Sequence, residues 1–189
     1  MNNIFSHFRI NRLRVIGRGK LLYDQKFHEG VNIIRGQNGS GKSTISDFIF
    51  YILGGEYDDW KESARMSDEV QAEITTAKGL LTLKRAVGTK QTPISIFFGS
   101  MNDAESHGLE GWNVFPIRRQ NGKESFSQVM FRSAGIPEAQ SEGASNITMH
   151  QILRLCYSDQ RTPATRLFRF ESFDTHGIRE AVGDLVCGV

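Results

Sequence analysis

The stretch from Gly36 to Thr44 constrains the fold of this 189-residue chain more than any other feature. It fits the pattern G-x-x-x-x-G-K-[ST], a loop whose backbone N–H groups surround a phosphate. Glycine lets the chain curl until successive N–H groups point at one anion. Lys42 can then reach the β- and γ-phosphates of a nucleotide, and the Ser43 hydroxyl can bind Mg²⁺. The predicted phosphate-binding residues are Gly36, Gln37, Asn38, Gly39, Ser40, Gly41, Lys42, Ser43 and Thr44.

The flanking sequence supports this interpretation of the motif. Val31–Ile34 is a short apolar run, which predicts a buried parallel strand. After the motif, apolar residues recur at helical spacing up to Leu53, and Gly54-Gly55 predicts the end of the helix. Strand, glycine-rich loop and amphipathic helix are the setting that such a motif requires. The sequence therefore predicts binding of a nucleoside triphosphate.

Most of the remaining chain reads as antiparallel strands followed by helices. Residues 8–16 and 21–27 predict a hairpin, and Arg18 in its turn is a candidate nucleotide or DNA contact or else a solvated cation. Three more alternating segments predict an added antiparallel β-layer: 70–76, 81–85 and 94–98. We expect a loop over 99–111 and a short strand within 112–117. Helical patterns begin at Ser125, Thr148 and Ile178.

Composition narrows the class of protein only modestly. A net charge of +2 does not by itself argue for a nucleic-acid partner. Cys156 and Cys187 lie in apolar surroundings, and we expect both to be buried, reduced thiols. No apolar run has the length of a membrane span, so we expect no membrane partner and a cytoplasmic location. The five histidines show no metal-ligand spacing.

The sequence also lacks parts that a hydrolysing enzyme of this kind needs. Such an enzyme requires an apolar strand that ends in a carboxylate, and often a neighbouring Glu that orients water. The apolar run at Ile94–Phe98 ends in Gly99-Ser100, and no Leu-Ser-Gly-Gly signature occurs. Two interpretations stay open. Either the catalytic lobe lies downstream of this segment, or the segment only binds nucleotide.

The chain resembles, over nearly its whole length, the N-terminal head lobe of SMC-like ATPases, which are of the ABC type. The resemblance rests on residues 13–18, on 27–44 with Asn38 in the loop, and on Leu53-Gly54-Gly55. It implies an α/β P-loop NTPase fold, an ABC/SMC-type head lobe with an added antiparallel β-layer. It implies that residues 1–189 are one N-terminal lobe, incomplete without a coiled coil and a C-terminal lobe. Residues 178–189 resemble the last helix before such a coiled coil.

The same resemblance implies a reaction, cofactors and partners. Leu153–Gln160 is similar to the family's Q-loop, in which a glutamine reaches the Mg²⁺ and the attacking water. The resemblance therefore implies that Gln160 and Lys42 are the catalytic residues. The cofactors would be ATP and Mg²⁺. Two heads, in a homodimer, would sandwich two ATP molecules, and the cycle would act on DNA or on nuclease or accessory subunits. A basic cluster at Arg118, Arg119 and Lys123 is a candidate DNA contact. The role would be DNA repair or antiphage defence, the latter by similarity to SMC-like subunits of the Lamassu type.

Three other classes of function remain as alternatives. The chain could be the nucleotide-binding subunit of an ABC transporter, although Gln160 lies much farther after Lys42 than in such subunits. It could be a small-molecule kinase, although no acceptor-site or lid residues are recognisable. It could also be a nucleotide-dependent scaffold that does not hydrolyse ATP.

Overall fold

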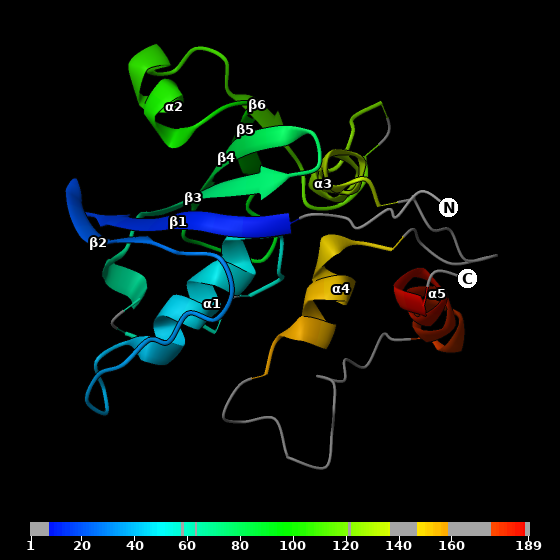
Figure 1. Ribbon diagram of the computed structural model, residues 1–189, viewed down its shortest axis with the longest axis horizontal. Coiled ribbons are helices and arrows are strands. Elements are labelled where there is room, and N and C mark those ends of the chain that lie inside the picture. The colour runs from blue at the N-terminus through cyan, green and yellow to red at the C-terminus, as the bar shows by residue number, and fades with distance from the viewer. Residues whose placement is uncertain are drawn as a thin grey trace.

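The computed structural model of the protein describes residues 8–57, 59–62, 64–120, 122–136, 147–158 and 175–187 (Figure 1). The elements follow one another as β1 (Phe8–Gly17), β2 (Lys20–Lys26), α1 (Lys42–Ile52), the 3₁₀ turn η1 (Ala64–Met66), β3 (Glu69–Thr76), β4 (Gly79–Ala86), β5 (Ile94–Phe97), α2 (Met101–His107), β6 (Asn113–Phe115), α3 (Phe126–Ala134), α4 (Met149–Cys156) and α5 (His176–Cys187).

The strands form one six-stranded sheet in the order β2-β1-β3-β4-β5-β6, and every neighbouring pair is antiparallel. Short turns explain this topology, because hairpins join β1 to β2 and β3 to β4. The predicted N-terminal hairpin, the three later strands and the short strand near Phe115 are all confirmed. The fold is α/β, with an antiparallel sheet beside the helix that follows the phosphate-binding motif.

The sheet separates α1 from α2, with α1 on one face and α2 on the other (Figure 1). Alternation along β1, β3, β4 and β5 sends apolar side chains to the α1 face, where they meet α1 and α3 in the main core. The opposite face is polar and holds α2 through charged groups. Glu73 accepts the Met101 N–H at 2.8 Å, and Arg14 forms an ion pair with Glu105.

Local capping explains where the later helices begin and end. Ser125 and Gln128 form a capping box at the start of α3, and Gly135 ends that helix in a left-handed conformation. Thr148 and Gln151 form the equivalent box at α4. The predicted starts at Ser125 and Thr148 are therefore confirmed, and the predicted C-terminal helix corresponds to α5.

Two smaller predictions are wrong. Residues 99–111 were expected to form a loop, but they contain α2, because the Ser100 hydroxyl accepts the Asp103 N–H at 3.1 Å and the Asp103 carboxylate accepts the Ser100 N–H at 3.2 Å. Cys156 was expected to be buried, but it is exposed, because it is the last residue of α4 and borders an open apolar pocket. The side chain of Cys187 lies outside the part described.

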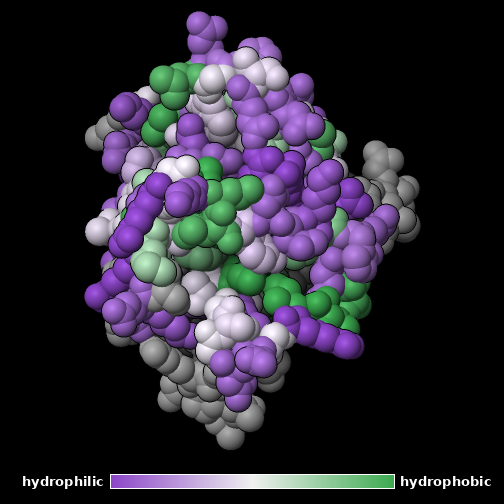
Figure 2. All heavy atoms as spheres, turned by 90° about the vertical axis from the view of Figure 1, so that its left-hand side faces the viewer, coloured by the Kyte–Doolittle hydropathy of each residue, from purple (hydrophilic) through white to green (hydrophobic). Residues whose placement is uncertain are grey.

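The predicted buried strand at Val31–Ile34 is also wrong. The segment between β2 and α1 has no strand pairing, and Val31 and Ile33 are 80% and 71% exposed. The physical reason is that a strand needs a neighbour. Within the described residues the sheet ends at β2, and the chain leaves it after Lys26. Figure 2 looks at this end of the molecule and shows apolar side chains gathered at the surface among polar ones.

Candidate nucleotide-binding site

The loop over residues 36–41 has the backbone geometry that phosphate binding requires. Gly39 and Gly41 have φ of 83° and 86°, in the left-handed region where a side chain would be strained. The Ser40 N–H donates to the Gln37 carbonyl at 3.2 Å, which closes the loop into a turn. Gly41 is the N-cap residue of α1, so the loop leads directly into the helix. All of residues 36–40 are exposed, which leaves them accessible to a ligand.

The N-terminus of α1 offers unoccupied donors and partial positive charge. No side chain caps this end, and its first turn contains no acidic residue. The first N–H groups of a helix have no intrahelical acceptor, and the helix dipole adds positive potential there. Together with the loop, this arrangement fits the phosphate groups of a nucleotide.

Lys42 lies folded over the loop. Its Nζ donates to the carbonyl oxygens of Gly36 at 2.8 Å and Gln37 at 2.7 Å. The ammonium group is therefore held at the loop, where incoming phosphate oxygens would compete with these carbonyls. A charged acceptor forms the stronger hydrogen bond, so exchange of carbonyl for phosphate is favourable.

Ser43 and Thr44 occupy the first turn of α1 beside Lys42. Ser43 is half-buried and Thr44 is buried. In the described part of the chain, no group of three or more His, Cys, Asp or Glu side chains could hold a metal ion. The Ser43 hydroxyl and Gln160 stay the predicted protein ligands for a Mg²⁺ ion that would arrive with its nucleotide.

The other end of α1 is fixed by a residue whose role the sequence did not reveal. Arg85 is 1% exposed and donates to the Tyr51 and Gly55 carbonyls at the end of α1. It also donates to the carbonyls of Lys90 and Thr92, each at 3.0 Å, in the loop after β4. The pKa of Arg85 is lowered to about 10 by burial, so the group is charged at neutral pH. The sequence did contain a signal for this role, because Arg85 is a cation at an inward-facing position of the alternating strand β4.

Two predicted site residues lie in other segments of the chain. Arg18 lies in the β1–β2 turn with φ of 52°, and its N–H donates to the Asp68 carboxylate. Gln160 lies outside the described residues. Both assignments stay predictions.

The predicted basic cluster lies on the surface between β6 and α3. Arg118, Arg119 and Lys123 are all exposed. Arg118 donates to the Glu56 carboxylate at 3.1 Å, so part of the cluster's charge is compensated. Its role also stays a prediction.

Comparison with known proteins finds similarity over part of the chain. The chain is 29% identical over 103 residues to a protein described as DNA replication and repair protein RecF, from Tropheryma whipplei (strain TW08/27). The match covers 53% of this chain and 26% of that protein, so the chain spans about a quarter of its relative's length. No helix among the described residues is long and apolar enough to cross a membrane.

A family model described as an AAA domain matches residues 8–162. The match takes in the sheet, the loop 36–41, α1 and α4. It covers more than half of the chain, and on that basis the chain belongs to this family of AAA domains.

Proposed function

We propose that this chain is the ATP-binding lobe of an SMC/RecF-like ATPase head that acts on DNA. The observation that carries the proposal is the loop 36–41, which runs into the uncapped N-terminus of α1 with Lys42 folded over it. The RecF-type relative, a protein named for DNA replication and repair, supports the proposal that this ATPase acts on DNA.

Each part of the site has a distinct task. The N–H groups of the loop and of the first turn of α1 bind the phosphates, and Lys42 turns from the loop carbonyls to the β- and γ-phosphates. The Ser43 hydroxyl is a ligand for Mg²⁺, which when bound neutralises charge on the phosphates. Gln160 would contact the same Mg²⁺ ion and the attacking water. ATP bound to two such heads favours their engagement, because the closed pair binds the nucleotide better than the open heads do.

The exposed apolar segment at Val31–Ile34 supports the proposal that another part of the head covers this surface. Side chains such as Val31 and Ile33, each more than two-thirds exposed, contribute roughly 1.5–3 kcal/mol when they become buried. We propose that the rest of the head, a C-terminal lobe that follows a coiled coil, pairs with this segment as a strand. That lobe would also supply the catalytic carboxylate.

The direct test of ATP binding is calorimetric titration of the native full-length protein with ATP and Mg²⁺. Lys42→Ala should weaken binding by at least about a hundredfold, because two charge-assisted bonds contribute about 1.5–3 kcal/mol each. Lys78→Ala is the matched control, since Lys78 lies exposed in the β3–β4 turn. Unchanged affinity of Lys42→Ala would refute the assignment of the site.

DNA binding can be tested by fluorescence anisotropy at several salt concentrations. If Arg119 and Lys123 contact phosphates, their replacement by Ala weakens binding to all sequences and reduces the salt dependence by about one unit of slope per residue. Affinity and slope identical to those of the unmodified protein would exclude this cluster as the DNA contact.

A further inference from the structure

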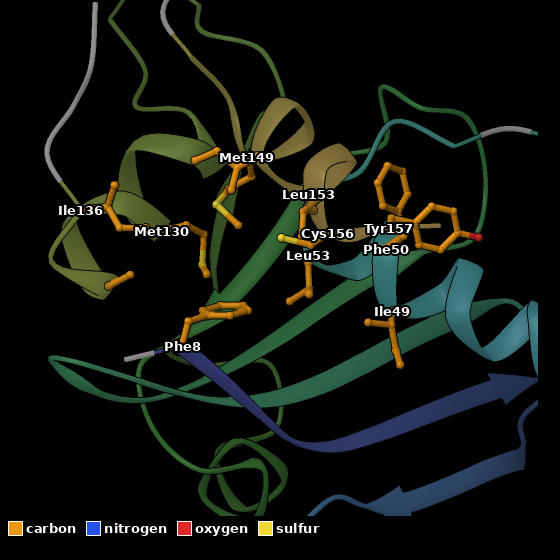
Figure 3. Close-up of a pocket in the computed structure, with 12 residues that line it drawn as sticks. Phe8, Ile49, Phe50, Leu53, Met130, Ile136, Met149, Leu153, Cys156 and Tyr157 are labelled. Atoms are coloured by element: carbon orange, nitrogen blue, oxygen red, sulfur yellow. The ribbon is translucent and has the colours of Figure 1, made fainter. Parts of the chain in front are cut away.

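The end of α4 is attached to the helix that begins at the phosphate-binding loop. The Tyr157 hydroxyl, one residue beyond α4, donates to the Asp47 carboxylate in α1. The Tyr157 ring packs on Phe50 with ring centres 4.8 Å apart. Figure 3 shows the two rings side by side where α4 meets α1.

The start of α4 has a second attachment, beyond the C-terminal end of α1. The Nδ1 atom of His150 accepts the Glu56 N–H at 2.9 Å, just beyond the end of α1. His150 also meets Phe50 edge to face, with ring centres 5.6 Å apart. The two helices therefore run antiparallel, with one polar attachment near each end of α4.

Between these attachments the packing is incomplete. An apolar pocket of about 310 Å³ lies between α1, α3 and α4, and Met130, Met149 and Leu153 contribute to its lining (Figure 3). Tight packing would hold a helix in one position, whereas a void beneath it leaves room to shift. The hydrogen bond between Tyr157 and Asp47 therefore helps to fix the position of the end of α4.

Asp47 links this contact to the nucleotide site. Residues four apart on a helix lie on the same face, so Asp47 lies one turn beyond Ser43. Asp47 is 6% exposed, and a buried carboxylate is costly without a hydrogen-bond donor. A change in the first turn of α1 thus alters the surroundings of the carboxylate that holds Tyr157.

We propose that the Tyr157–Asp47 hydrogen bond is a positioning contact that couples the end of α4 to nucleotide at the loop 36–44. The inference rests on the proposed ATP binding and adds a regulatory element to that site. Coupling of this kind is reciprocal, so nucleotide tightens the attachment of α4, and the attachment strengthens nucleotide binding.

Cys156 provides a reporter, because its exposed thiol is adjacent to Tyr157. The experiment measures the rate at which iodoacetamide alkylates Cys156 in the native full-length protein, by mass spectrometry of its peptide, with and without ATP and Mg²⁺. We expect saturating nucleotide to slow alkylation severalfold. We expect no such protection in Tyr157→Phe, which keeps the ring on Phe50 but loses the hydroxyl. Tyr23→Phe, in β2, is the matched control and should behave as the unmodified protein.

Asp47→Asn tests the other partner of the contact. Each single variant should weaken ATP binding by up to about tenfold, and the double variant no more than either single one, since both remove the same interaction. Protection that persists in Tyr157→Phe, or effects that add in the double variant, would overturn the proposal. If the unmodified protein does not bind ATP at all, the proposed function itself is refuted.

Discussion

Gly54 is the position at which the packing of the helices can be tested most sharply. It follows α1 with φ of 101°, where any side chain is strained. A Cβ atom there would lie 2.8 Å from Cε1 of Phe126 and 3.2 Å from Cβ of Met149. Gly54 is therefore the point where the end of α1 meets the start of α3 and the start of α4.

Gly54→Ala should lower the free energy of unfolding by roughly 2–5 kcal/mol. Backbone strain contributes roughly 1–2 kcal/mol, and the clash with buried groups adds roughly 1–3 kcal/mol. Gly79→Ala separates the two terms, because Gly79 has φ of 120° but an added Cβ would meet nothing within 4 Å. Urea denaturation followed by circular dichroism gives both values. If Gly54→Ala were no more destabilising than Gly79→Ala, the proposed packing of α1 against α3 and α4 would be wrong.

Two further predictions concern charged groups. Asp24 accepts hydrogen bonds from Arg12, at 2.6 Å to each carboxylate oxygen, and these bonds hold its pKa below the ordinary 3.8. Because the folded pKa is the lower one, the stabilisation is complete above about pH 4 and is lost as the pH falls further. Melting temperatures from pH 7 to pH 2 should therefore fall more steeply in the unmodified protein than in Asp24→Asn, and parallel curves would contradict this. Arg85→Lys should destabilise the protein by about 2–4 kcal/mol, because one ammonium group cannot reach carbonyls on both sides of the guanidinium; unchanged thermal stability would show that these bonds contribute little.

The sequence predicted the elements whose signals are local. The alternation in β3 and β4, the capping residues of α3 and α4, and the hairpin of β1 and β2 all lie within short windows, and the structure has them. The glycine pattern at 36–41 likewise predicted a left-handed loop that leads into a helix.

Two kinds of prediction failed. Some concern elements that need a partner distant in the sequence, and one concerns a helix whose only local signal was its capping pair. Val31–Ile34 has the composition of a buried strand, but strand pairing needs a neighbour that the described residues do not provide. The helix α2 is polar, and the capping pair of Ser100 and Asp103 was its signal. The contacts of Arg85 with the end of α1, and of Tyr157 with Asp47, join residues more than 25 positions apart, so no local pattern contains them.

The central claim, that the loop 36–41 and the first turn of α1 bind nucleotide phosphates, can be tested by hydrogen exchange. Amide exchange of the native full-length protein is measured by mass spectrometry with and without saturating ATP and Mg²⁺. The account predicts slower exchange at residues 39–44, where the N–H groups of the loop and of the first turn of α1 would donate to phosphate oxygens. Unchanged exchange at these amides in the presence of bound ATP would contradict it, because the nucleotide would then lie elsewhere.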